Sequence, residues 1–295
     1  MKKFRFQDRS VELDQRAECF LKTVAWLGGY VTAEQAQELG IRNSGPRVHG
    51  QLKDLEAWGF LNRVTTYPAV YQVTKSVTRL LGADLSARRR HSIETVRTRL
   101  LTVNFYLEAV HWPMEFVFDH PQKVSKLMQL GCDSSMLPQR AGKTYLWQDF
   151  VLRGPSGDLS VAMIDHYSRN AYKQLHRFLE RFAVSLACAA EDMKLLVVVP
   201  SDARHRLFSR LLRQPKIQTL LPEMLNGSQT AVKVYRVRRP VPVVHSFIPT
   251  NHDLREFWTS RWLDRREPGK ALPSQALDNN GNSTNPRLQK GDASW

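Results

Sequence analysis

Two aspartates and one lysine in the second half of the chain have the types and order used in metal-dependent cleavage of a phosphodiester. Asp149 and Asp165 fall on two successive predicted strands, and Lys173 follows in the next predicted helix. Carboxylates on neighbouring strands can hold Mg²⁺ and activate water beside an amine. The candidate catalytic residues are therefore Asp149, Asp165 and Lys173, and the candidate metal ligands are Asp149 and Asp165. Mg²⁺ is a cofactor only if the chain is a nuclease.

This arrangement resembles the core of the PD-(D/E)xK nuclease-like superfamily, with one departure. The resemblance implies an acidic residue, any residue and then Lys at the second motif, whereas Asp165-His166-Tyr167 has Tyr in the lysine position. Lys173 would have to substitute from the helix, where a lysine is usually solvated. The sequence therefore favours an inactive nuclease-like domain, with no cofactor, over an enzyme.

The elements that would position these residues alternate between strands and helices from Trp112 onward. Hydrophobic periodicity predicts strands over 116–118, 145–152, 159–165, 194–200 and 231–237, and helices over 121–130, 168–191, 201–213 and 252–263. This order predicts an α/β sandwich with a mixed sheet, and with the resemblance a restriction-endonuclease-like domain over 111–266.

A second candidate site lies in the segment 44–60. Ser44 is a suitable N-cap, Pro46 follows within the first turn, and Gly59 ends the run. Val48, Leu52 and Leu55 recur at i, i+4 and i+7, so one face of this helix can dock on a core. The other face is left free for a partner.

That free face carries residue types that contact phosphates and base edges. The runs 61–66 and 70–73 are β-rich and flank a short tip, so the order of helix, strand, tip and strand predicts a winged helix. Helices over 13–27, 33–39 and 75–81 complete a winged helix-turn-helix domain over 10–84. The DNA-binding candidates there are Ser44, Arg47, His49, Gln51, Lys53, Arg63 and Tyr67.

An arginine-rich stretch links the two parts. A helix is predicted from Ser86 to about Ala109, and Arg88, Arg89 and Arg90 stand at its beginning. Such a cluster can neutralise phosphates without reading sequence, and it is equally typical of a solvated connector helix. Residues 85–110 are therefore assigned as a connector with three candidate DNA contacts.

Composition restricts the partners. The 295 residues include 43 Lys+Arg against 28 Asp+Glu, a net charge of +15, which favours a polyanion such as nucleic acid. There is neither an apolar run of the roughly 18 residues that span a bilayer nor an apolar signal core, which predicts a cytoplasmic protein without membrane contact. The three widely spaced cysteines suggest no disulfide framework or metal site. Residues 267–295 are polar and predicted to be disordered.

The combined pattern resembles a known family. The segments Gly50-Gln51-Leu52-Lys53-Asp54-Leu55-Glu56-Ala57-Trp58-Gly59-Phe60-Leu61 and Ile164-Asp165-His166-Tyr167-Ser168-Arg169, joined by the Arg-rich connector, look like the replication-relaxation proteins of plasmids and integrative elements, in particular their mobilisation protein C branch. This resemblance implies an accessory that binds double-stranded DNA at an origin of transfer or replication. It also implies a relaxase or coupling protein as partner.

Two other functions stay open on the sequence. A winged-helix transcriptional regulator would use the same helix and would need an effector pocket or a dimer interface in the second domain. A homodimer in solution and a palindromic site would favour it. A metal-dependent nuclease of a defence or transposition system would use Asp149 and Asp165 with Mg²⁺. Cleavage lost on Asp149→Ala would favour the nuclease, and specific binding without cleavage would favour the accessory.

Overall fold

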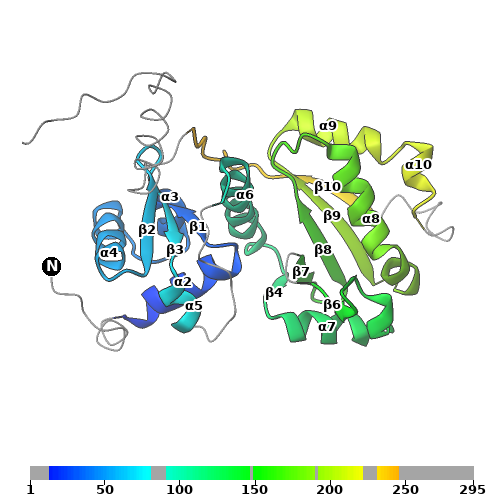
Figure 1. The fold of residues 1–295 in the computed structure, drawn as a ribbon, viewed down its shortest axis with the longest axis horizontal. Helices are drawn as coiled ribbons and strands as arrows, with labels where there is room; N and C mark the ends of the chain where they lie inside the picture. The colour runs from blue at the N-terminus through cyan, green and yellow to red at the C-terminus, as the bar shows by residue number, and fades with distance from the viewer. Residues whose placement is uncertain (1–12, 81–90, 147–148, 190–191, 222–230, 246–295) are drawn as a thin grey trace, which may run out of the picture. The chain divides into compact units, whose positions relative to one another are not determined.

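The computed structural model describes residues 13–80, 91–146, 149–189, 192–221 and 231–245 (Figure 1). The N-terminal part, residues 13–80, is a small antiparallel sheet with helices packed on it. Its elements are α2 (Gln15–Trp26), β1 (Tyr30–Thr32), α3 (Ala33–Glu38), α4 (Gly45–Ala57), β2 (Leu61–Thr65), β3 (Val70–Val73) and α5 (Lys75–Leu80).

Local signals account for most of these limits. The Asp14 carboxylate caps α2, and Thr32 forms a reciprocal capping box with Gln35 at the start of α3. Buried side chains from α2, α4, β2 and β3 share one hydrophobic cluster, to which α4 contributes Val48, Leu52 and Leu55. The predicted helices and the β2–β3 hairpin are therefore confirmed.

The strand β1 was not predicted. It pairs antiparallel with β3, where Val31 lies opposite Tyr71, and gives the sheet the order β1-β3-β2. The strand has only three residues, the last of which is the Thr32 cap, and these are too few to show a period of two, so their pairing depends on the hairpin that they meet.

The sheet part, residues 91–245, contains a central mixed sheet. Its elements are α6 (Ile93–Ala109), β4 (Glu115–Val117), α7 (His120–Gln129), the 3₁₀ turn η1 (Ser134–Met136), β5 (Gln139–Arg140), β6 (Lys143–Thr144), β7 (Phe150–Arg153), β8 (Leu159–Ile164), α8 (Ala171–Cys188), β9 (Met193–Val199), α9 (Asp202–Leu211), α10 (Pro215–Gln218) and β10 (Val232–Arg236).

The five central strands have the order β10-β9-β8-β7-β4. Strands β4, β7 and β8 form an antiparallel meander, while β9 runs parallel to both β8 and β10. Alternate strand residues face different helices: Val161 packs with α8 and α9, whereas Ala162 packs with α6. The predicted sandwich with a mixed sheet is confirmed, with helices on both faces (Figure 1).

Several predicted boundaries were wrong. The helix predicted from Ser86 begins, in its described part, only at Ile93, because His91 and Ser92 are not helical and the Ser92 side chain caps the first turn. The strand predicted over 145–152 is shorter, so that Asp149 precedes β7. The helix predicted from Ser168 starts at Ala171, after the Asn170 cap.

The helix α6 is also more than a solvated connector. It buries Leu100 with residues of the N-terminal hairpin and Phe105 with residues of the central sheet. The Gln35 amide donates to the Leu100 carbonyl and to the Asn104 side chain at 2.9 and 2.7 Å. The predicted boundaries at 84 and 110 stay a prediction, as does the connector between them.

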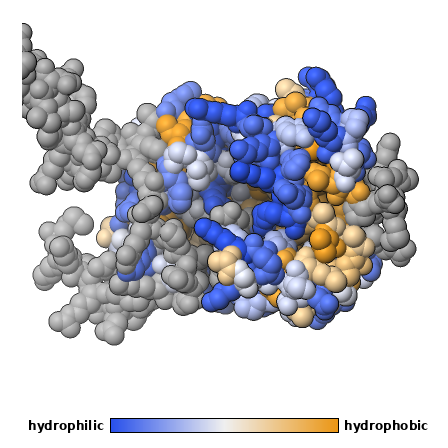
Figure 2. All heavy atoms as spheres, turned by 45° about the vertical axis from the view of Figure 1, so that its right-hand side comes forward, coloured by the Kyte–Doolittle hydropathy of each residue, from blue (hydrophilic) through white to orange (hydrophobic). Residues whose placement is uncertain are grey.

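On the face shown in Figure 2, most of the described surface is hydrophilic, and hydrophobic residues are confined to patches. Each helix within the described ranges is too short or too polar to cross a membrane. The C-terminal helix and the tail predicted over 252–295 lie outside the described residues.

Candidate nucleic-acid interface

The helix α4 has one buried face and one free face. The buried Val48, Leu52 and Leu55 fix its orientation on the N-terminal core, as their spacing predicted. Arg47 and Lys53 on the opposite side are exposed, and neither forms a hydrogen bond or ion pair with a described residue. Two cations that have no partner among the described residues can therefore approach a polyanion without first breaking a contact with that part of the protein.

The N-terminus of α4 adds to this positive region. Ser44 is the N-cap residue, yet its hydroxyl makes no capping hydrogen bond. The backbone N–H groups of the first turn of a helix form the positive end of the helix dipole, and phosphates bind well there. His49, in the next turn, is exposed, with Nδ1 2.8 Å from the Gly45 carbonyl oxygen.

Gln51 is less free than its position on the helix suggested. Arg42 donates from Nη2 to the Gln51 side-chain oxygen at 2.5 Å and to Asp14 Oδ2 at 2.6 Å. Bidentate reading of adenine requires both the oxygen and the nitrogen of a glutamine. In this arrangement only the Gln51 nitrogen is available, so base reading requires release of Arg42.

Acidic residues mark the other end of the same helix. Asp54 and Glu56 are exposed in its C-terminal half, and a Glu56 carboxylate oxygen accepts from the backbone N–H of Arg63 at 3.3 Å. A phosphate would be repelled there and attracted at the end that carries Arg47. The charge pattern thus favours docking by the N-terminal half of α4.

The β2–β3 hairpin presents one aromatic side chain to solvent. Tyr67 at its tip is 91% exposed. Arg63 folds onto the tip, donating to the carbonyl oxygens of Thr65 and Thr66 at 3.2 and 3.0 Å. Arg63 therefore stabilises the tip, and it retains part of its guanidinium for an external anion.

The arginine-rich stretch is described only in part. Arg88, Arg89 and Arg90 lie outside the described residues. Arg97 donates to the Val244 carbonyl oxygen at 3.1 and 2.6 Å, so it holds the segment that follows β10. Arg99 lines a pocket that is considered below.

In the sheet part, Asp149 is buried in an ion pair. Arg181 of α8 donates to both carboxylate oxygens, at 3.2 and 2.7 Å, and the Lys123 ammonium donates to the Asp149 carbonyl oxygen at 2.8 Å. Burial raises the pKa of the Asp149 carboxyl, and Arg181 opposes that shift. The charge of Asp149 is thus compensated by the protein itself.

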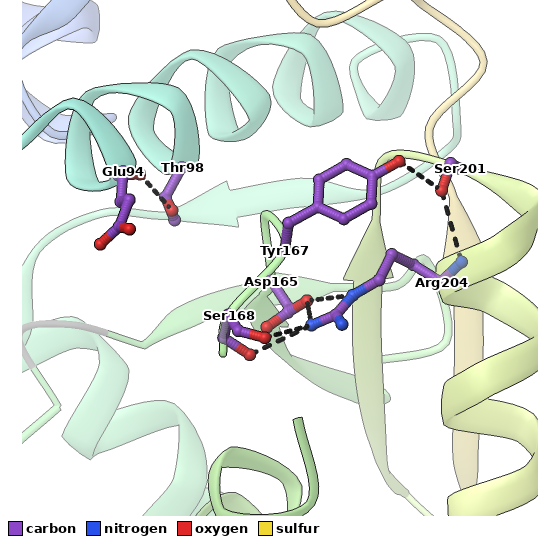
Figure 3. A network of polar contacts seen from close by, with 7 residues as sticks. All are labelled: Glu94, Thr98, Asp165, Tyr167, Ser168, Ser201 and Arg204. Atoms are coloured by element: carbon purple, nitrogen blue, oxygen red, sulfur yellow. Dashed lines mark hydrogen bonds and ion pairs between the residues drawn. The ribbon is translucent and has the colours of Figure 1, made fainter. Parts of the chain in front are cut away.

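Asp165 is compensated in the same way. Its side chain is fully buried, and Arg204 of α9 donates to Oδ2 from Nε at 3.0 Å and from Nη2 at 2.5 Å (Figure 3). Arg204 also donates to the backbone and hydroxyl oxygens of Ser168 at 3.2 and 3.1 Å. The other carboxylate oxygen, Oδ1, is buried without a partner among the described residues.

Tyr167, which stands in the lysine position of the resembled motif, belongs to the same network. Its hydroxyl donates to Ser201 Oγ at 2.8 Å, and the Arg204 guanidinium lies 5.6 Å from its ring centre (Figure 3). The ring therefore covers the ion pair of Asp165. Tyr167 takes over the position without supplying the charge of a lysine.

The three candidate catalytic residues do not form a metal site. Lys173 is exposed in the first turn of α8, and its side chain contacts neither carboxylate. Within the described ranges, no cluster of three or more His, Cys, Asp or Glu side chains could hold a metal ion. Mg²⁺ needs carboxylate oxygens that are free to bind it. Arg181 occupies both oxygens of Asp149, and Arg204 occupies Oδ2 of Asp165, which leaves only the buried Oδ1 of Asp165, so the residues present do not fit Mg²⁺.

Sequence reasoning missed the cations that neutralise the two aspartates. One signal was available: Arg204 shares the buried face of α9 with Phe208 and Leu211, and Lys123 shares that of α7 with Leu127. A cation within an apolar stripe is rarely buried without a partner.

Comparisons with protein-family models, with curated proteins and with solved structures give no match to this chain.

Proposed function

We propose that this protein binds double-stranded DNA sequence-specifically and does not cut it, as an accessory to relaxase-dependent mobilisation or replication of a plasmid or integrative element. One observation carries the DNA-binding part. The exposed face of α4 presents Arg47 in the first turn and Lys53 in the C-terminal half, neither of them paired with a described residue, while the opposite face is anchored in a core. This combination is typical of a recognition helix.

The elements around α4 support the same reading. A short helix, α3, precedes it, and the β2–β3 hairpin follows with Tyr67 exposed at its tip. In a winged helix-turn-helix domain the second helix enters the major groove while the hairpin lies along the backbone. Arg47 would then contact bases or phosphates near the start of the helix, and Lys53 would lie further along the same exposed face.

The sheet part supports an inactive nuclease-like scaffold. Helix α6, the antiparallel strands β4, β7 and β8, helix α8 and the parallel strand β9 follow one another in the order that the resemblance implies. The buried pairs of Asp149 with Arg181 and Asp165 with Arg204 support a structural role for both carboxylates. The relaxase or coupling-protein partner is implied by the resemblance alone.

The test uses a duplex target selected from random sequences by the full-length protein. Arg47→Ala should weaken binding to this target by about 1 to 3 kcal/mol, and binding to random duplex by less, because a base contact is lost. Lys22→Ala is the matched control: it removes one cation from α2, where Lys22 is paired with Glu18, away from α4.

Equal losses on target and random duplex for Arg47→Ala would refute the assignment of α4 as the recognition helix. Failure of the wild-type protein to select any duplex would refute the proposed function itself. A regulator is separated from an accessory by capture: the accessory retains a relaxase or coupling protein from its own element, and a regulator retains none.

A further inference from the structure

A pocket of about 420 Å³ lies where two strands of the central sheet separate. The β7–β8 register ends at Phe150 and Ala162, whereas β8 continues to Ile164. Side chains of α6 and α8, from opposite faces of the sheet, line the resulting opening. Its volume lies within the roughly 300 to 1,000 Å³ typical of small-ligand sites.

Each helix turns a polar stripe toward this opening. On α6 the lining residues are Thr95, Thr98, Arg99 and Thr102, which are one face of a helix because they recur at i, i+3, i+4 and i+7. On α8 they include Gln174, Arg177 and Arg181 at i, i+3 and i+7. A helix that packs on a sheet usually presents apolar residues there, so these stripes indicate a polar occupant.

The charge in the pocket is positive. Three arginines line it, Arg99, Arg177 and Arg181, together with a single carboxylate, that of Asp149, which is paired with Arg181. Neither Arg99 nor Arg177 forms a hydrogen bond or ion pair with a described residue. We define the arginine pocket by Arg99, Arg177 and Arg181.

Arg99 is held in place although no described residue forms a hydrogen bond or ion pair with it. The end of its side chain packs over Gly28, where an added Cβ would lie 2.3 Å from Arg99 Cδ, 2.8 Å from Nε and 3.0 Å from Nη1. Burial lowers the pKa of Arg99, which shows that its charge is partly desolvated. A desolvated guanidinium gains most from an anion that accepts hydrogen bonds from its planar fork.

The available donors restrict that anion. The hydroxyls of Thr98 and Thr102 donate to carbonyl oxygens one turn earlier on α6, at 2.9 and 3.0 Å. The Thr95 hydroxyl shares a hydrogen bond with Ser92 Oγ at 3.0 Å, and Arg181 is paired with Asp149. Among the lining residues the donors left are therefore the guanidinium groups of Arg99 and Arg177 and the Gln174 amide. Planar bidentate donors match the oxygens of a phosphate.

We propose that the arginine pocket binds one phosphate group of a DNA strand, an inference that rests on the proposed DNA binding. The site would replace the metal of an active nuclease by arginines: phosphodiester oxygens would be held by Arg99 and Arg177, and no group would activate water. DNA would then contact both α4 and the sheet part of the chain.

The first arm of the test measures phosphate alone. Thermal unfolding of the full-length protein is followed in inorganic phosphate and in sodium chloride of equal ionic strength. Phosphate should raise the melting temperature of the wild type, and Arg177→Gln should weaken phosphate binding by about tenfold or more, since a charged hydrogen bond is lost. Arg177 is exposed, so this variant should fold. Arg213→Gln, at an exposed arginine after α9, should bind phosphate like the wild type.

Equal effects of phosphate and chloride on the wild type, or an unchanged response in Arg177→Gln, would overturn the pocket. Arg99→Gln gives an independent check from the other helix. Even if Arg99→Gln has a lower melting temperature in chloride, its increase in melting temperature on going from chloride to phosphate can still be compared with that of the wild type and of Arg177→Gln. An increase as large as that of the wild type, in either variant, counts against the proposal.

The second arm identifies the source of the phosphate. Binding to the selected duplex is measured over a salt series, where Arg177→Gln should reduce the salt slope by about one. An unchanged slope together with lost phosphate binding would assign the pocket to free phosphate or a nucleotide and overturn the DNA source. Phosphate binding by a wild type that binds no duplex would leave the pocket intact and refute the proposed function instead.

Discussion

Asp165→Asn is a sharp test of whether the nuclease-like carboxylates are structural. The substitution keeps the shape of the side chain and removes its charge, while Arg204 keeps its own charge at a side-chain exposure of 11%. Removal of one partner from a buried ion pair costs roughly 3 to 5 kcal/mol. The Asn oxygen can still accept, and Ser168 still accepts from Nη2, so we expect the lower end, about 3 kcal/mol.

For a described core of this size, 1 kcal/mol corresponds to roughly 2 to 4 °C, so the melting temperature should fall by roughly 6 to 12 °C. Calorimetry and urea unfolding followed by circular dichroism would measure it. The double variant Asp165→Asn with Arg204→Met should recover much of the loss, because an apolar pair of similar volume carries no desolvation cost. An unchanged or higher melting temperature for Asp165→Asn would refute the structural role, since a ligand-binding carboxylate without its metal is usually a burden on stability.

Three further predictions follow from single residues. Burial lowers the pKa of Lys123 to about 8 from the usual 10.5, so between these two pH values the unfolded chain binds more protons than the folded chain. The free energy of unfolding of the wild type, measured in urea relative to Lys123→Met, should therefore rise from pH 8 to 10.5 by at most about 3 kcal/mol. A difference between the two proteins that does not change with pH would contradict the burial of a charged Lys123. Burial raises the pKa of the Cys132 thiol to about 11, so little of it is the reactive thiolate at pH 8. Mass spectrometry should therefore find Cys132 alkylated on the order of a hundredfold more slowly at pH 8 than the exposed Cys19, and equal rates would refute the burial of Cys132. A Cβ at Gly50 would meet nothing within 4 Å, so Gly50→Ala should stabilise α4 by about 0.5 to 1 kcal/mol. The same variant should weaken specific DNA binding if the backbone of α4 lies close to DNA at Gly50. An unchanged affinity for DNA would mean that the backbone of α4 stays away from DNA there.

The elements that could be predicted are those encoded by neighbouring residues. The limits of α4 follow from Ser44, Pro46 and the spacing of its apolar residues, and the limits of α9 follow from the Ser201 cap. The long apolar run over 194–200 predicted a strand, and the structure has β9 there. In each of these cases the signal in the sequence lies within a few neighbouring positions of the chain.

The features that could not be predicted depend on contacts between distant segments. The pairing of β1 needs β3, some forty residues later. The two-residue strands β5 and β6 are too short to show any period. The roles of Asp149 and Asp165 depend on Arg181 and Arg204, each more than thirty residues away, so their charges could be seen in the sequence but not their compensation.

The most direct test of the proposed function measures binding and cleavage together. Labelled duplex fragments from the genetic neighbourhood of the protein are incubated with the full-length chain, with and without Mg²⁺, and resolved on native and denaturing gels. We predict retention of one fragment, unchanged by Mg²⁺ and without a cut product. A Mg²⁺-dependent product that disappears in Asp149→Ala would contradict the account, because Asp149 would then be a ligand of a catalytic metal and not the buried partner of Arg181.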